Sequence, residues 1–307
     1  MVELYTSQEI LETGLRLAGF EWRGNVDGPT NLRRFSACYG ASHSALAALW
    51  DGLHFASDTL AALEDDDSII DLLITLLFFK VYGSEHVTVA MVTPYFVKMN
   101  MNIPHETYVR NTVWRFAAKL QAHKEEVIVW PDWEMTQEED RDQFLFTVDG
   151  VHFRVQETPH DTLYRDNKMY SFKFKSAGVD YQLCIAIRSE DFLVHCYGPV
   201  KASTHDLTVW HESGVEARVP FGKFGLGDSA YGSIECIAYK NPMDDPAVKQ
   251  FKSRALARHE SYNKRLKNFG ILDSTFRHDL TKHGMVVDAV IVILQYSMKT
   301  DAPLFDV

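Results

Sequence analysis

The sequence predicts an α/β fold for the second half of the chain, preceded by an all-α domain. Three observations support this prediction. Apolar residues recur at helical spacing up to about residue 123, they form strand-like runs from residue 143, and a helical pattern returns at residue 246. The chain has 307 residues, more than a domain with one hydrophobic core usually contains, so two domains are expected.

The composition is that of an ordered globular protein, with 46% hydrophobic and 12% aromatic residues and no low-complexity tract. The first residues lack the pattern of a signal peptide, and the most apolar run, Ile69–Val81, contains Asp71 and Lys80. Neither export nor a membrane span is therefore expected. Four scattered cysteines favour buried thiols in a reducing compartment over a zinc site.

The N-terminal domain is expected to be helical over residues 1–125. Within it, Gly40 provides a turn, Ser42 is a candidate helix cap, and an apolar-faced helix runs to Trp50. This pattern fits a helix-turn-helix and equally an ordinary pair of packed helices, because no basic cluster marks the second helix as a DNA reader. The junction between the domains is expected at 125–142, which includes the acidic stretch Glu134–Asp142.

The second domain is expected over residues 143–300. Its pattern reads strand, strand, strand, helix, strand, helix, which is the order of an RNase H-like α/β domain with a mixed sheet. The expected strands cover 143–148, 181–187, 191–197 and 221–226, a short helix follows a cap at Thr204, and a long helix covers 246–269.

Three carboxylates fall at informative places in this pattern. Asp149 and Asp228 each follow a strand, and these two strands are neighbours in such a sheet, so the two side chains should converge. Glu260 lies on the polar side of the long helix, opposite Tyr262 and Leu266. Shared carboxylates can hold two divalent metals about 3.5–4 Å apart, and Mg²⁺ prefers oxygen ligands. The sequence therefore predicts Asp149, Asp228 and Glu260 as catalytic residues, with two Mg²⁺ or Mn²⁺ ions.

Asp206 is a fourth acidic candidate. It could be an additional metal ligand, or it could favour its own helix through its charge at the N-terminus, and the sequence leaves both interpretations open. The expected metal ligands are Asp149, Asp206, Asp228 and Glu260.

The formal net charge of −11 is unusual for a protein that binds DNA unaided, because phosphates normally require a basic surface. A local basic patch offers one answer, since residues 249–267 contain seven Lys or Arg and a single acid. The alternative is a solvated amphipathic helix in which Glu260 pairs with Lys264. The residues expected to contact DNA are Arg258, Lys264, Arg265 and Lys267.

Five sequence blocks together resemble the DDE endonuclease domain of PIF/Harbinger transposases over roughly 143–295. The matching blocks are residues 148–152 (VDGVH), 170–175 (YSFKFK), Gly198-Pro199 with Thr204-His205-Asp206, 227–232 (GDSAYG), and 258–260 (RHE) followed by 265–267 (RLK). The chain departs from the family pattern at Ala230, where the family has Gly, and around Glu260, where an Ile-Glu-Arg-like segment is usual.

This resemblance implies a metal-dependent endonuclease or transposase that hydrolyses phosphodiesters and transfers strands. It places Asp149, Asp228 and Glu260 as the triad and Asp206 in the family's His-Asp motif. Family descriptions differ on whether Asp206 or Asp228 is the second acid, and topology favours Asp228. The alternative is a domesticated transposase that serves as a non-cleaving DNA- or protein-binding nuclear module. Another metal phosphohydrolase is disfavoured because no Gly-rich nucleotide-binding loop is present.

The resemblance also bears on partners and location. DNA is the expected substrate, and a separate Myb/SANT-like DNA-binding protein is the expected partner, which would explain how an acidic catalytic chain reaches its target. Residence in the nucleus follows from the same resemblance. Self-association as a homo-oligomer is left open.

Overall fold

The computed structural model describes residues 4–133, 143–156, 169–188 and 192–307. The chain divides into two compact units. The first comprises residues up to 127 together with 266–274 and 285–303, and the second comprises 128–265, 275–284 and 304–307. The expected domain limits, 1–125 and 143–300, stay a prediction, because two segments of the expected second domain group with the helical unit.

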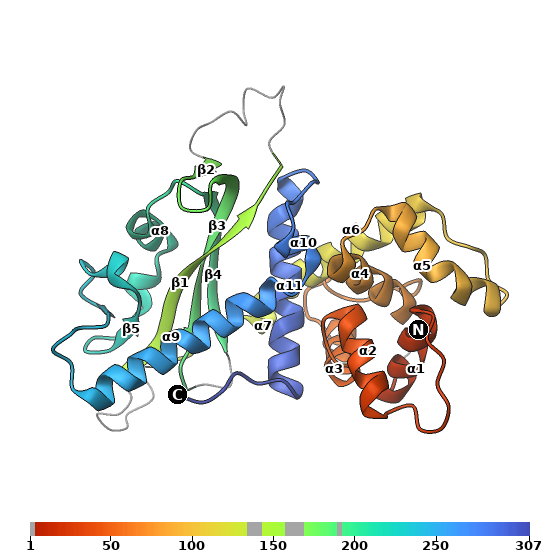
Figure 1. The fold of residues 1–307 in the computed structure, drawn as a ribbon, viewed down its shortest axis with the longest axis horizontal. Helices are drawn as coiled ribbons and strands as arrows, with labels where there is room; N and C mark the ends of the chain where they lie inside the picture. Colours follow the sequence, from red (N-terminus) through yellow and green to blue (C-terminus); the bar gives the residue numbers. More distant parts are fainter. Residues whose placement is uncertain (1–3, 134–142, 157–168, 189–191) are drawn as a thin grey trace. The chain divides into compact units, whose positions relative to one another are not determined.

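The first unit is helical, as predicted. Its described helices are α1 Ser7–Leu17, α2 Pro29–Tyr39, α3 His43–His54, α4 Ile69–Val81, α5 Glu85–Lys98, α6 Glu106–Ala122, α7 Lys124–Val127 and α10 Gly270–Asp273, with most of α11 Thr281–Thr300 (Figure 1). Helix α4 is buried on nearly all sides, which explains why its sequence is apolar around the whole helix. Within the described ranges, no helix combines the length and apolarity needed to cross a membrane.

The turn between α2 and α3 has the predicted chemistry. Gly40 adopts a left-handed conformation with φ of 75°, and a Cβ on this residue would lie 2.5 Å from the ring of Phe269. The hydroxyl of Ser42 accepts the backbone N–H of Ala45 at 3.1 Å. The predicted Gly turn and Ser cap are thus confirmed, whereas DNA reading by this helix pair stays a prediction.

The second unit contains a mixed sheet, which confirms the predicted RNase H-like α/β fold. Its described strands are β1 Phe144–Arg154, β2 Tyr170–Ser171, β3 Ser176–Ala186, β4 Leu193–Lys201, β5 Phe224–Leu226 and β6 Ile237–Ala238. The strand order is β2-β3-β1-β5-β6, with β4 also paired to β3. Strand β1 is antiparallel to β3 and parallel to β5, and β5 is parallel to β6.

Helices cover both faces of this sheet. The short helix α8 Asp206–Ser213 contributes Trp210, which stacks on Phe146 of β1 in a core with Val148. The long helix α9 Pro246–Leu266 lies across the sheet (Figure 1), and its His259 is bonded to Thr147. Because side chains alternate along a strand, successive residues of β1 face α8 and α9 in turn.

Several predicted element limits differ from the structure. Strand β1 does not stop at Asp149 but continues to Arg154, because β3 pairs with it beyond this point, with Asp149 opposite Leu183. Strand β5 begins at Phe224 rather than at residue 221. The cap of α8 is His205, whose ring accepts the N–H of Leu207 at 3.3 Å, and not Thr204. The acidic stretch 134–142 lies outside the described residues.

The packing of Phe146 provides a test of this core. Phe146 is fully buried between Trp133 and Trp210, so Phe146→Ala should lower the free energy of unfolding by about 3–5 kcal/mol. Phe221, which is fully exposed, is the control, and Phe221→Ala should change it by less than about 0.5 kcal/mol. Urea titration measures both values, and equal effects of the two substitutions would contradict the assigned core.

Candidate active site

The pairing of β1 with β5 sets the position of two carboxylates. Thr147 of β1 lies opposite Leu226 of β5, and the two strands run parallel. Asp149 and Asp228 each follow two residues beyond this pair. The predicted convergence therefore follows from the observed register. It brings the charges of the two side chains close enough to interact.

Asp149 is the most perturbed carboxyl of this group. Burial, the largest contribution, together with the charges of Glu260 and Asp228 raises its pKa from 3.8 to about 6. Two contributions oppose this rise: the backbone N–H of Gly150, which Oδ1 accepts at 2.8 Å, and the charge of Lys173. A half-buried carboxyl beside two other acids is poorly stabilised as an anion, and such perturbation is frequent at functional sites.

Asp228 and Glu260 are both exposed. Asp228 caps the short helix Ser229–Tyr231, because its Oδ1 accepts the N–H of Ala230 at 2.8 Å. Glu260 lies in the middle of α9, and its charge acts on Asp149. The three predicted catalytic acids thus form one electrostatic group.

Asn263 is a member of this site that the sequence analysis did not identify. Its Nδ2 donates to Oδ2 of Asp149 at 3.3 Å, and the side chain is buried. One turn earlier on α9, Nδ1 of His259 lies 2.8 Å from the hydroxyl of Thr147, and burial lowers the pKa of His259 to about 3, so its ring is neutral. The i, i+4 spacing of two polar residues could have signalled this role, because buried polar side chains need partners.

Asp206 joins the same acidic group from α8. The carboxylate of Asp206 lies beside Gly150 of β1, because a Cβ added to Gly150 would be 3.6 Å from Oδ1 of Asp206, an ordinary van der Waals distance. Burial raises the pKa of Asp206, as do the charges of Asp228 and Asp180. Asp206 is also the first residue of α8, where a negative charge favours the helix. Both interpretations of this residue therefore stay open.

The predicted DNA-contacting cations are placed very differently. Arg258 is only 4% exposed, and its guanidinium donates to the carbonyl oxygens of Ala186 and Phe305, so it stabilises the fold and is not offered to DNA. Burial lowers its pKa to about 10. Arg265 is half-buried, and Lys264 and Lys267 are exposed. The basic patch is accordingly smaller than the sequence suggested.

The chemistry of these acids fits a hard divalent cation. All four are oxygen donors, and the pKa of Asp149 is raised by burial and by the negative charges of Glu260 and Asp228, which a bound cation would offset. Over the described residues, however, no three His, Cys, Asp or Glu side chains are close enough to form a ready metal site. The charges of the acids interact, but binding of one ion by several of them requires their side chains to move closer together.

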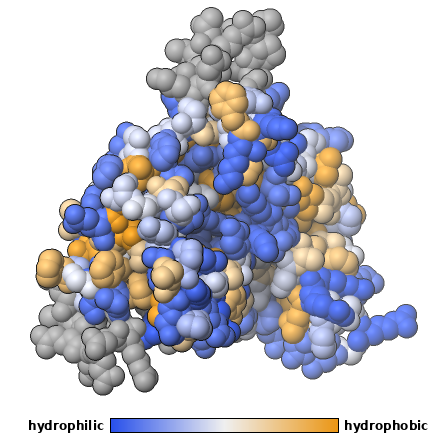
Figure 2. Space-filling model, turned by 60° about the vertical axis from the view of Figure 1, so that its left-hand side comes forward, coloured by the Kyte–Doolittle hydropathy of each residue, from blue (hydrophilic) through white to orange (hydrophobic). Residues whose placement is uncertain are grey.

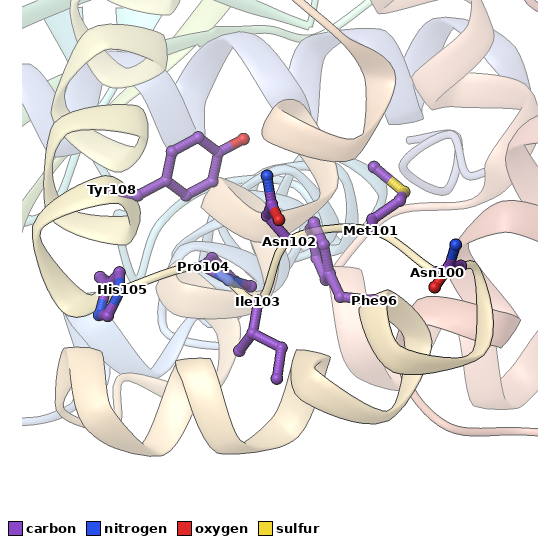
Figure 3. Close-up of a pocket in the computed structure, with 8 residues that line it drawn as sticks. All are labelled: Phe96, Asn100, Met101, Asn102, Ile103, Pro104, His105 and Tyr108. Carbon is purple, nitrogen blue, oxygen red and sulfur yellow. The ribbon is translucent and has the colours of Figure 1, made fainter.

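A pocket of about 600 Å³ lies elsewhere, in the helical unit at the connection between α5 and α6. Figure 3 shows its lining, which includes Phe96, Met101, Ile103 and Tyr108. No acidic side chain belongs to this lining. The pocket and the carboxylate group are therefore separate features.

Comparison with known proteins identifies one family that the second half of the chain resembles. Residues 148–295 match the family described as DDE superfamily endonuclease. This range contains Asp149, Asp206, Asp228 and Glu260. No curated protein and no solved structure shows a significant match to the chain.

The raised pKa of Asp149 makes stability depend on pH. Between pH 3.8 and about pH 6, Asp149 keeps its proton in the folded state and loses it in the unfolded state. Asp149 therefore lowers the free energy of unfolding as the pH rises through that window. Asp149→Asn should remove this contribution and should be more stable than the wild type at pH of about 7 in metal-free buffer. Urea unfolding of both proteins across the window tests this, and a less stable variant at neutral pH would contradict it.

Proposed function

We propose that this chain, whose residues 148–295 form a DDE superfamily endonuclease domain, is a metal-dependent DNA endonuclease of the transposase kind. One observation carries the proposal. Two carboxylates, Asp149 and Asp228, extend equally far beyond a parallel strand pair, and a third, Glu260, acts on Asp149 from the adjacent helix. This arrangement suits phosphodiester hydrolysis and strand transfer.

Asp149, Asp228 and Glu260 would hold Mg²⁺ or Mn²⁺, with Asp206 as an additional ligand. When bound, divalent ions activate the attacking oxygen and stabilise the leaving 3′ oxygen of a phosphodiester. Asp149 must be ionised to serve as a ligand. Because its pKa is about 6, the carboxyl is mostly ionised before metal binding only above that pH. Asn263 orients Oδ2 of Asp149, and the neutral ring of His259 fixes α9 to β1.

Asp228 is favoured over Asp206 as the second acid. The parallel pairing of β1 with β5 fixes the position of Asp228 relative to Asp149, because both follow paired residues at the same distance along the chain. Asp206 approaches Gly150 from α8, and its position depends on the packing of that short helix. A role in orienting the substrate or one of the ions suits Asp206 best.

The proposal includes partners and location. DNA is the substrate, and a Myb/SANT-like DNA-binding protein would bring the chain to its target in the nucleus. The net charge of −11 supports such a partner, as does the use of the Arg258 side chain within the fold. Both features reduce the chain's own attraction for DNA phosphates.

Plasmid nicking tests the catalytic proposal. With Mg²⁺ or Mn²⁺ the purified chain should convert supercoiled plasmid to open circles, and Asp149→Ala, Asp228→Ala and Glu260→Ala should each reduce the rate at least about a hundredfold, because each removes a ligand. Glu212, exposed on α8, is a matched control, and Glu212→Ala should retain full activity.

The outcome of that assay separates the two functions considered. Absence of nicking in the wild type together with intact DNA binding would favour the non-cleaving module. Nicking that persists in both Asp149→Ala and Glu260→Ala would contradict the proposed site. Asp206→Ala separately distinguishes an essential ligand from an auxiliary one, since an auxiliary ligand should leave measurable activity.

Salt dependence of DNA binding tests the reduced basic patch. Lys264→Ala should lower the slope of log affinity against log salt concentration by about 0.9, the value for one phosphate contact. Lys249 lies exposed at the other end of α9, and Lys249→Ala should leave the slope unchanged. Fluorescence anisotropy with labelled duplex DNA measures both slopes, and identical slopes for wild type and Lys264→Ala would remove Lys264 from the interface.

A further inference from the structure

The turn between β2 and β3 presents two aromatic side chains to solvent, alternating with lysines. Phe172 is 83% exposed and Phe174 is 45% exposed, and both Lys173 and Lys175 are exposed. Hydrophobic side chains occur among hydrophilic ones elsewhere on the visible surface (Figure 2), so exposure alone carries no functional meaning. The anchoring and the position of this turn are what distinguish it.

The turn is fixed to the sheet beside the acids. The ring of Phe174 stacks on His152 of β1 with centroids 4.3 Å apart and planes at 11°. His152 is buried, and its Nδ1 lies 2.6 Å from Oδ1 of Asp180 on β3. The backbone N–H of Phe174 also donates to the hydroxyl of Ser171 at 3.3 Å. A turn held by a ring stack and hydrogen bonds loses little conformational entropy when it binds a ligand.

Phe172 is oriented by its neighbour yet is left out of the core. Its ring meets Tyr170 edge-on, with centroids 5.3 Å apart and planes at 82°, and most of its surface faces solvent. The ammonium of Lys173 lies 5.3 Å from the ring centroid of Phe174. The turn therefore offers one aromatic face together with two cations.

This turn lies close to the candidate active site. His152, on which it stacks, follows Asp149 by three residues on β1, which is about 10 Å along a strand. His152 shares its side of β1 with Gly150, where Asp206 approaches, and the charge of Lys173 reaches both Asp149 and Asp206.

We propose that Phe172 stacks on an unpaired base of the DNA strand held at the carboxylates, and that Lys173 and Lys175 bind the adjoining phosphates. An aromatic ring interleaved with lysines is the combination that binds single-stranded nucleic acid, because every base has a face for stacking and every nucleotide carries a charge. Bases within a duplex have both faces covered, so this turn selects DNA that is opened near the cleavage point. The inference rests on the proposed nuclease function.

Binding to two DNA probes tests it without cleavage. Asp149→Asn serves as the background, and the probes are a fluorescent duplex and the same duplex with a short unpaired bubble. The background protein should prefer the bubble, and Phe172→Ala should weaken bubble binding about tenfold while leaving duplex binding unchanged. Phe172→Trp should bind the bubble as tightly as the background protein, because it keeps an aromatic ring. Phe221→Ala, which removes another exposed ring, should have no effect on bubble binding.

The controls separate failure of this inference from failure of the nuclease proposal. Lys173→Ala and Lys175→Ala should each reduce the slope of log affinity against log salt concentration for the bubble probe by about 0.7, the value for one phosphate contact on a single strand. Unchanged bubble binding by Phe172→Ala overturns the inference even if the wild type nicks plasmid. Loss of self-association by Phe172→Ala in sedimentation, with DNA binding intact, would assign the ring to a second copy of the chain and also overturn it.

Discussion

The parallel pairing of β1 with β5 is the constraint on which the site depends. Because Thr147 and Leu226 are opposite each other, the chain has no freedom to separate the acids that follow them by two residues. Backbone hydrogen bonds thus hold together two negative charges that would otherwise repel each other. The energetic consequence is visible at Asp149, whose pKa rises to about 6 through burial and the charges of Glu260 and Asp228.

The surrounding structure keeps this unfavourable arrangement in place. Strand β3 pairs with β1 past Asp149, so the strand carrying the acid cannot bend away. Helix α9 is fixed by polar contacts at consecutive turns: His259 meets Thr147 and Asn263 meets Asp149. Arg258 ties the same helix to Ala186. The contacts of His259 and Arg258 are buried and that of Asn263 is partly buried. An unpaired buried polar group would cost about 1–3 kcal/mol, so the helix register is well determined.

Local patterns in the sequence predicted those features that local physics controls. Strand periodicity placed Asp149 and Asp228 on neighbouring strand segments, although Asp149 lies within β1 and only Asp228 follows its strand. Helix periodicity correctly placed Tyr262 and Leu266 on the buried side of α9. The turn at Gly40 was predictable because a left-handed position favours glycine. The catalytic roles of the three acids follow from these placements but stay a prediction.

Features set by distant segments could not be predicted in this way. An Asp-Gly pair normally suggests a turn, yet Gly150 continues a strand because β3 pairs along it. Arg258 was expected to be exposed because of its charge, but carbonyl groups of Ala186 and Phe305, far away in sequence, provide its partners. The bond from Asn263 to Asp149 joins residues on different elements, so the spacing of polar residues on α9 could signal a buried polar position but not its partner.

The central claim is that Asp149 and Asp228 form the core of a divalent-metal site, and anomalous diffraction from crystals soaked in Mn²⁺ tests it most directly. The account predicts an anomalous peak between these two carboxylates that disappears in crystals of Asp149→Asn. A peak located only at other residues, or none at the carboxylates in crystals that diffract well and were soaked at saturating Mn²⁺, would contradict it.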